Sequence, residues 1–157
     1  VHDKTDRHVV STLPAPGTDV PENRTVEVVI GIAPVVGDYV GCDIHDTGRS
    51  GVSLNGGDRK TLTGTGHFVD NCYIHHTGVF YKQGVGVSLS GVGQRVSHCL
   101  IHDTPRFAIM FTGNNHTLEF NHLRHLALET EDVGATYCGG RDWISPRGTV
   151  IRTSYTP

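Results

Sequence analysis

The sequence predicts an all-β chain built as a parallel β-solenoid. A phrase recurs along it, reading VGCDIHDTG from Val40, VDNCYIHHTG from Val69 and VSHCLIHDT from Val96, with a looser copy from Leu118. Apolar residues within each copy lie two positions apart, which is the period of a strand and not of a helix. Equivalent positions are 22 to 30 residues apart. This is the repeat length of solenoids, and it leaves room for three short strands in each turn.

Side chains of one kind recur at equivalent positions of the four copies. Stacked turns place such positions about 4.8 Å apart, so a column of apolar residues becomes a continuous core that no single turn can form. The first columns are Cys42, Cys72, Cys99 and Asn121, then Ile44, Ile74, Ile101 and Leu123, then His45, His75, His102 and Arg124. The columns of the later strand are Val52, Val87, Ile109 and Ala135, followed by Leu54, Leu89, Phe111 and Tyr137.

The chain divides into an arm and a repeat domain. Residues 1–24 contain three of the seven prolines and have no usable period, so we expect an irregular N-terminal arm or partial cap there. Residues 25–157 form the predicted solenoid domain. Longer loops at 57–66, 79–86 and 126–134 interrupt it. Loops on a repeat scaffold tend to gather on one face, which is its usual binding face.

Composition excludes several classes of protein. A formal charge of −3 over 157 residues and sparse aromatic residues give no basis for binding nucleic acid. No stretch has the length of an apolar transmembrane helix, so no membrane association is predicted, and the start VHDKTDRH has no signal-peptide core. Three of the four cysteines share one column, and we interpret them as stacked buried thiols, with a disulfide between neighbours as the alternative.

The phrases CxIHDTG and GVSLSG, and the segment from HDTPRFAIMFTGNNHTLEF to GGRDWISPRGTVIR, resemble right-handed parallel β-helix repeat proteins. That group includes pectate lyases and β-helix glycoside hydrolases, and the similarity covers residues 26–152. The resemblance implies a right-handed, single-stranded parallel β-helix, which for these repeats has about four to five turns. It also implies a carbohydrate role, with a polysaccharide or oligosaccharide as substrate and a secreted or periplasmic location.

Carboxylates near the fourth copy are the candidate catalytic groups. Glu131 and Asp132 lie in the loop 126–134, and Asp142 follows one strand later. A glycosidase needs two carboxyl groups, about 5–5.5 Å apart for retention or about 6.5–9.5 Å apart for inversion, and these residues can supply them. The alternative is that the acids cap a turn and form ordinary surface ion pairs with arginines.

Basic and aromatic residues of the neighbouring loops are the candidate substrate-binding groups. Stacked turns would place Arg106 near Glu131 or Asp132. A polysaccharide lyase is also compatible with this set, because it needs a base and a cation that neutralises a uronate carboxylate. The candidates are Tyr81, Lys82, Arg106, Arg141 and Trp143.

The histidine column gives a candidate metal site. His75 and His102, with Asp103 beside them, are candidate zinc ligands because imidazole and carboxylate groups suit a transition metal. The alternative is that they are turn residues of the repeat, since stacking alone places side chains in a row and a flat ladder converges poorly on one ion. No other cofactor is predicted.

These features together predict a carbohydrate-active enzyme, and a glycoside hydrolase in the first place. The alternatives are a polysaccharide lyase, a metal-dependent hydrolase of ester or phosphoester bonds that uses the His/Asp rows, and a non-catalytic glycan-binding solenoid. The ends of so short a solenoid carry unpaired N–H and C=O groups, so we also expect self-association into a homo-oligomer.

Overall fold

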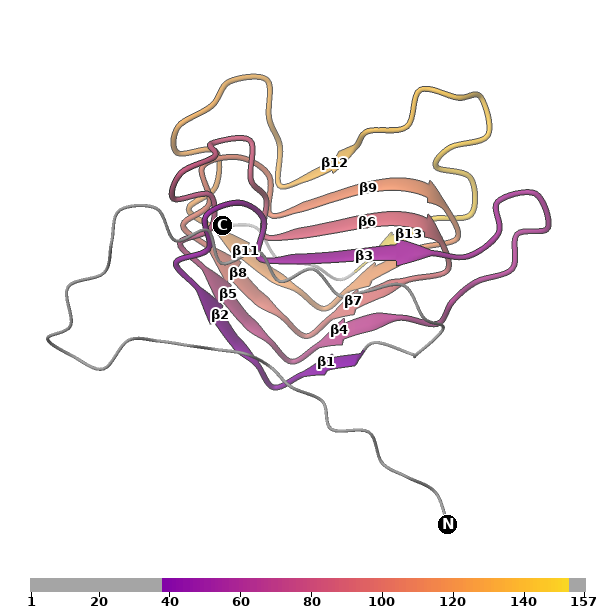
Figure 1. Ribbon diagram of the computed structural model, residues 1–157, viewed down its shortest axis with the longest axis horizontal. Coiled ribbons are helices and arrows are strands. Elements are labelled where there is room, and N and C mark those ends of the chain that lie inside the picture. Colours follow the sequence, from indigo (N-terminus) through magenta and orange to yellow (C-terminus); the bar gives the residue numbers. More distant parts are fainter. Residues whose placement is uncertain (1–37, 153–157) are drawn as a thin grey trace, which may run out of the picture.

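The computed structural model describes residues 38–152, which form thirteen strands and no helix (Figure 1). Because this part of the chain has no helix, it also contains no helical membrane span. The expected arm at residues 1–24 and the domain boundary that follows it lie outside the described residues.

The strands form three sheets in which all neighbours are parallel. The first sheet consists of β1 (Asp38–Val40), β4 (Phe68–Asp70), β7 (Arg95–Ser97), β10 (Thr117–Glu119) and β13 (Val150–Arg152). The second consists of β2 (Asp43–His45), β5 (Tyr73–His75), β8 (Leu100–His102) and β11 (His122–Arg124). The third consists of β3 (Val52–Gly56), β6 (Val87–Val92), β9 (Ile109–Asn114) and β12 (Thr136–Cys138).

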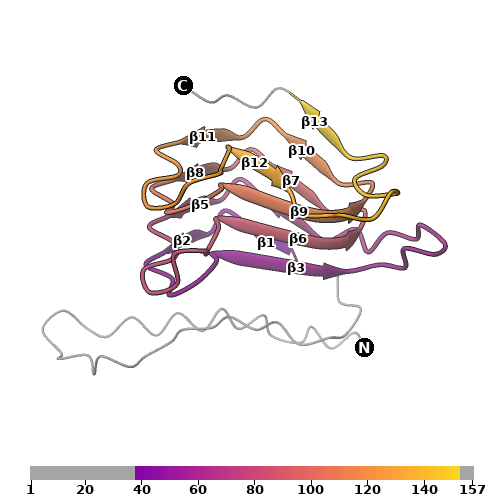
Figure 2. The ribbon, with the colours of Figure 1, turned by 90° about the horizontal axis from the view of Figure 1, so that it is seen from above.

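Each strand pairs with the strand three places before it and the strand three places after it in the chain. The chain therefore adds one strand to each of the three sheets in every repeat. Figure 2 shows the repeats as layers, with β1 to β3 at one end and β13 at the other. The predicted all-β class and the parallel pairing of equivalent strands are therefore confirmed.

Inward side chains of the three sheets make one apolar core. Each inward residue stacks on its equivalent in the next repeat, as Ile44 does on Ile74 and Ile74 on Ile101. Burial of one such side chain contributes roughly 1.5–3 kcal/mol relative to an exposed one, so this stacking stabilises strands that are short by themselves. The buried core comprises Val52, Leu54, Val69, Cys72, Ile74, Val87, Leu89, Val96, Cys99, Ile101, Ala108, Ile109, Phe111, Leu118 and Leu123.

The cysteine column stacks as predicted at the corner between the first and second sheets. All four cysteines are free thiols, and Cys72 and Cys99 are buried. Asn121 takes the cysteine position in the fourth repeat. Its amide oxygen accepts from the backbone N–H of Cys99 at 3.0 Å, and its amide nitrogen donates to the carbonyl oxygen of Val96 at 3.0 Å. The polar residue is accommodated in the interior because both ends of its amide are satisfied.

Two corners of each repeat use the left-handed region of backbone conformation. The φ angles at these corners lie between 47° and 62°. Asparagine and aspartate tolerate this region better than most residues, which explains part of the repeated sequence pattern. The first corner is formed by Gly41, Asn71, His98 and Phe120, and the second by Asp46, His76, Asp103 and His125.

The fourth repeat departs from the predicted register by one residue. The columns predicted to end in Ala135 and Tyr137 are wrong, because the residues of β12 that pair with the inward positions of β9 are Thr136 and Cys138. A slip of one residue exchanges the two faces of a strand.

A bulge at the start of β9 causes the slip. The N–H groups of Ala108 and Ile109 both donate to the carbonyl oxygen of Ala135, at 3.1 and 3.2 Å, so two residues of one chain segment oppose one residue of the other. Tyr137 consequently stacks on Phe107, with ring centroids 4.4 Å apart and planes 6° apart. No feature of the repeated phrase marks this bulge in the sequence.

Glycines stack near the ends of the long strands of the third sheet. Gly91 pairs with Gly56 on one side and with Gly113 on the other. Their φ angles are 149°, 105° and 100° for Gly56, Gly91 and Gly113. A Cβ atom on Gly91 would overlap the carbonyl oxygen of Gly56. Both the backbone angle and the lack of space therefore require glycine at Gly91.

Replacing Gly91 tests this stacking. Gly91→Ala should lower the free energy of unfolding by about 3 kcal/mol, because the methyl group meets backbone and the residue keeps a strained φ. In the matched control Gly134→Ala, the new Cβ meets only the carbonyl oxygen of Thr136 at 3.5 Å. The control should change stability by less than about 0.5 kcal/mol. Urea unfolding measures both variants, and equal stabilities would contradict the close backbone approach.

Candidate functional site

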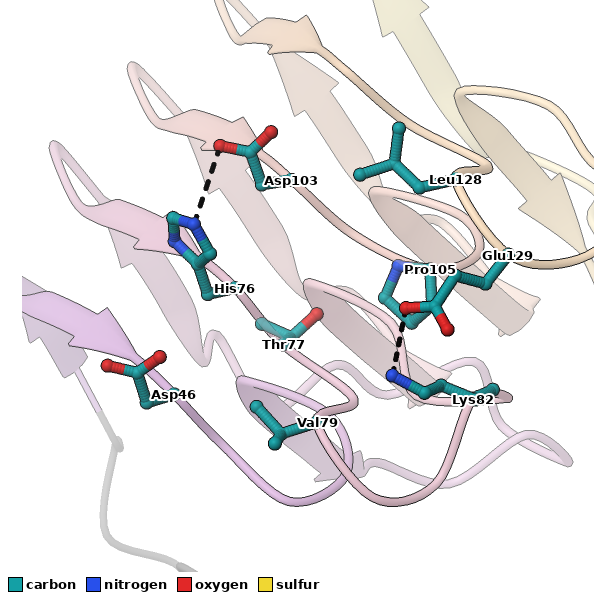
Figure 3. A pocket seen from close by; sticks show the side chains of 9 residues that line it. All are labelled: Asp46, His76, Thr77, Val79, Lys82, Asp103, Pro105, Leu128 and Glu129. Carbon is teal, nitrogen blue, oxygen red and sulfur yellow. Dashed lines mark hydrogen bonds and ion pairs between the residues drawn. The ribbon is translucent and has the colours of Figure 1, made fainter.

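Four loops that join the second sheet to the third gather along one side of the stack. These lateral loops span residues 46–51, 76–86, 103–108 and 125–135, one from each repeat. They surround an open hollow of about 270 Å³ (Figure 3). The hollow is lined by Asp46, His76, Thr77, Val79, Lys82, Asp103, Pro105, Leu128 and Glu129.

One side of the hollow is a file of acidic and imidazole side chains. The corner file consists of Asp46, His76, Asp103 and His125, which occupy the same left-handed position of successive repeats. Asp103 is its centre: the carboxylate lies 3.9 Å from Nε2 of His76 and 3.3 Å from Nδ1 of His125. Figure 3 shows Asp46, His76 and Asp103 in this order along the stack.

The histidines that precede the corner residues in the chain form a second file of stacked rings beside the corner file. The ring of His75 lies between those of His45 and His102, with centroids 5.1 and 5.2 Å apart and planes 12° and 9° apart. His102 is buried, and its Nδ1 hydrogen-bonds Asp103 at 2.6 Å while its Nε2 hydrogen-bonds the hydroxyl of Tyr73 at 2.8 Å. His102 therefore fixes the orientation of the Asp103 carboxylate.

The surroundings of Asp103 favour its ionised form. Partial burial alone would raise the pKa of Asp103, but the hydrogen bond from His102 and the nearby His76 and His125 outweigh this effect and lower the pKa below its ordinary value. Burial lowers the pKa of His75, which favours the neutral imidazole there. The corner file thus presents a carboxylate at neutral pH.

The opposite side of the hollow is formed by an ion pair and an apolar surface. Nζ of Lys82 lies 2.8 Å from Oε1 of Glu129, across 47 residues of sequence. The loop that carries Glu129 is anchored on Pro105, whose carbonyl oxygen accepts from the N–H of Glu129 at 3.2 Å and from the hydroxyl of Thr130 at 3.0 Å. Val79, Pro105 and Leu128 supply the apolar part of the lining.

Thr77 departs from the pattern of its column. The hydroxyls of Thr47 and Thr104 each donate to the carbonyl oxygen two residues further on, at 3.2 and 2.9 Å. Thr77 is 3% exposed, and its hydroxyl has no hydrogen-bond partner among the described residues. Figure 3 shows this hydroxyl pointing between the corner file and the pair of Lys82 and Glu129.

The structure does not bring the three predicted catalytic acids together. Glu131 and Asp132 are exposed in the lateral loop before β12, whereas Asp142 lies in the loop after it, and the two loops leave opposite ends of the strand (Figure 1). The three residues of β12 separate these loops, which corresponds to about 7 Å along the strand. None of the three acids lines the hollow.

Asp142 has a bracing contact instead. Nη2 of Arg59 donates to Oδ1 of Asp142 at 2.8 Å and to the hydroxyl of Ser145 at 2.9 Å, while Nε donates to Asn114 at 3.1 Å. Arg59 thereby ties the loop 57–66 to the loop after β12. Its hydrogen bond lowers the pKa of Asp142 from 3.8 to about 2, with partial burial opposing the shift.

The predicted substrate-binding residues separate into two groups. Lys82 lines the hollow, while Tyr81 lies under the guanidinium of Arg49 and Arg106 lies over the ring of Phe107, at 4.8 and 4.4 Å. The other two, Arg141 and Trp143, are exposed in the loop after β12, at the far end of the third sheet, with Trp143 92% exposed.

The candidate zinc ligands form a flat ladder. His75 and His102 stack face to face, so their ring nitrogens lie side by side and do not converge. Between residues 38 and 152 no group of three or more His, Cys, Asp or Glu side chains is arranged to hold a metal ion. Of the three candidates only Asp103 lines the hollow.

Sequence reasoning missed the combination that forms the hollow. It treated the His/Asp rows and the acidic loop as separate sites, whereas Asp46, His76 and Asp103 face Lys82 and Glu129. The available signal was that HDT, HHT and HDT are followed by loops of unequal length, because unequal loops on a regular stack leave a recess.

Comparison with protein families, with curated proteins and with solved structures finds no match to this chain. The assignment of chemistry therefore depends on the site itself.

Removing Arg59 tests the brace at Asp142. In Arg59→Ala the pKa of Asp142 should rise from about 2 toward its ordinary value of 3.8, because the lost hydrogen bond is the main cause of the shift, while the hydrogen bonds from Ser145 keep part of it. The interaction of Arg59 with Asp142 contributes fully to the free energy of unfolding above pH 3.8, where the carboxyl is ionised in both the folded and the unfolded chain. This contribution is lost as the pH falls through about 2, where the carboxyl of the folded protein takes up a proton. A carboxyl-carbon NMR titration measures the pKa. Arg141→Ala is the matched control and should leave it unchanged; an equal shift in both variants would contradict the brace.

Proposed function

We propose that the protein is a glycoside hydrolase that cleaves a polysaccharide or oligosaccharide in the hollow between the lateral loops. One observation carries the proposal: Asp46 and Asp103 occupy the same corner of the stack with one repeat between them, and both line the hollow. Two carboxyl groups that face a common recess are the minimum equipment of glycoside hydrolysis.

The spacing of the repeats supports an inverting mechanism. Adjacent parallel strands lie about 4.8 Å apart, so the Cα atoms of Asp46 and Asp103 are about 9.6 Å apart across two steps. Carboxyl pairs of inverting enzymes are separated by about 6.5–9.5 Å, which leaves room for a water molecule beside the sugar. The Cα separation of about 9.6 Å is close to the upper end of this range.

The environments of the two acids assign their roles. Asp103 is held ionised by His102, His76 and His125, so it acts as the general base that takes a proton from the attacking water. The carboxylate of Asp46 lies 2.7 Å from Nδ1 of His45, so the two side chains act together as the general acid: His45 supplies the proton, which passes through Asp46 to the leaving oxygen. After each cycle Asp103 releases its proton to solvent and His45 takes one from solvent, which restores both groups.

The rest of the lining suits a sugar ring. Val79, Pro105 and Leu128 offer apolar contacts to the C–H face of a pyranose, while Lys82 and Glu129 offer hydrogen bonds to its hydroxyls. Polar side chains on two sides of an apolar surface orient the ring relative to Asp103.

We also propose that the repeats wind as a right-handed β-helix of about four turns, related to pectate lyases and β-helix glycoside hydrolases. The support is general: a connection between parallel strands of one sheet is right-handed in about 98% of cases. The motifs quoted above agree with this relationship. The expected homo-oligomer stays a prediction, which light scattering at micromolar concentration tests.

Amide substitutions test the catalytic assignment. Asp103→Asn should lower kcat by a factor of about 10²–10⁴ on any glycoside that the wild-type enzyme cleaves, because the amide cannot accept the proton from water. Asp46→Asn should lower kcat most for substrates with poor leaving groups. NMR of the first product should show the inverted anomer.

Glu131→Gln is the matched control, because Glu131 is an exposed acid of the same group of loops outside the hollow. It should keep at least about half of the wild-type rate. Full activity of Asp103→Asn, or loss of activity in Glu131→Gln alone, would contradict the proposal. Binding of a glycan without hydrolysis by the wild-type protein would identify a glycan-binding solenoid, and an unsaturated product would identify a lyase.

A further inference from the structure

We propose that the sugar bound in the hollow carries a protonated amine, so that the substrate class is a glycoside of a hexosamine with a free amino group. This inference rests on the proposed glycosidase and names its substrate class. It depends on the charges, the hydrogen-bonding groups and the size of the hollow.

The charges that line the hollow favour a cation. Asp46, Asp103 and Glu129 are three carboxylates, and Lys82 is the one ammonium group of the lining. Lys82 is already paired with Glu129 at 2.8 Å, so the two aspartates of the corner file have no cation of comparable strength opposite them. A ligand with one positive charge would reduce this imbalance.

Other charged groups of the lateral loops do not reverse this sign. The guanidinium groups of Arg49 and Arg106 lie over the rings of Tyr81 and Phe107 and are outside the lining. Glu131 and Asp132 are exposed on the last lateral loop and add negative charge to the group of loops that surrounds the hollow. A uronate would therefore meet repulsion both on approach and in the hollow.

The hydrogen-bonding groups of the lining are mostly acceptors. The carboxylates of Asp46 and Asp103 accept only, and the hydroxyl of Thr77 is buried without a partner while pointing into the region between the two sides. The main donor, Lys82, is used by Glu129. The carboxylates of Asp46 and Asp103 accept from His45 and His102, at 2.7 and 2.6 Å, and each keeps further acceptor positions. An ammonium group brings three donors and no acceptor, so it matches these remaining acceptors better than a hydroxyl or a carboxylate does.

The size of the hollow limits the ligand to one sugar unit. Its volume of about 270 Å³ is below the range of about 300–1,000 Å³ that is usual for drug-sized ligands. The amine must therefore belong to the sugar unit that lies between Asp46 and Asp103, and the rest of a chain would extend outside the lining.

Calorimetric titration of the wild-type protein tests the inference with four methyl glycosides. They are the glucosaminide, the N-acetylglucosaminide, the glucoside and the glucuronide. The glucosaminide should bind about tenfold or more tightly than the glucoside, because a charge-assisted hydrogen bond is roughly twice as strong as a neutral one. N-acetylation removes the charge and should abolish the preference. The preference should also shrink between low and high salt.

Two variants locate the effect. Asp46→Asn should weaken binding of the glucosaminide about tenfold and change binding of the glucoside less than about twofold, because the amide keeps the shape and removes the charge. Glu131→Gln, outside the hollow, should preserve the preference. If Asp46→Asn does not fold, the four-ligand comparison on the wild-type protein decides by itself.

The outcomes separate this inference from the proposed function. Equal binding of glucosaminide and glucoside, or tighter binding of the glucuronide, would overturn the amine while leaving a glycosidase in place if neutral glycosides are cleaved. Tight binding of the glucosaminide with no cleavage of any glycoside would overturn the enzyme and support the amine site.

Discussion

Backbone hydrogen bonds between successive repeats hold equivalent residues of this chain about 4.8 Å apart along the stack. Under this constraint a residue type that recurs in the sequence becomes a straight file in space. Ile44, Ile74 and Ile101 become core, and Gly56 and Gly91 become a point of backbone contact. No single repeat can bury its own apolar residues, so the fold is stable only when the repeats stack and equivalent residues come into contact.

The candidate functional residues lie where equivalent positions of successive repeats differ in chemical type. The core files repeat one chemical type, whereas the corner file alternates acid and imidazole from Asp46 to His76 to Asp103. The left-handed backbone of this corner favours short polar residues there, so the same turn chemistry that ends a strand also places carboxylates at its edge. Loops of unequal length then bring Lys82 and Glu129 opposite this file. The hollow therefore arises from the unequal loops, although the strands beneath them stack regularly.

The period of two and the repeated phrase were sufficient to predict the parallel pairing and most of the core. They were not sufficient for β12, because the bulge at Ala108 and Ile109 arises from how one loop closes and leaves no mark in the repeat. The positions of the predicted acids relative to one another were not foreseen, for a different reason. Asp142 is close to Asp132 in sequence, but β12 lies between them and carries the chain to the other end of the sheet. Side chains that are distant in sequence meet across stacked loops, and only the loop conformations reveal which ones.

Paired cysteine substitutions on the outer face of the third sheet test the stacking most directly. Ser53 lies opposite Ser88, so Ser53→Cys with Ser88→Cys places two Cα atoms about 4.8 Å apart, within the range that a disulfide spans. Ser53→Cys with Ser90→Cys is two residues out of register and about 8 Å apart, beyond that range. Peptide mapping by mass spectrometry after mild oxidation should find the disulfide in the first pair and not in the second. Equal cross-linking of both pairs, or preferential cross-linking of the second, would contradict the register on which the fold and the site depend.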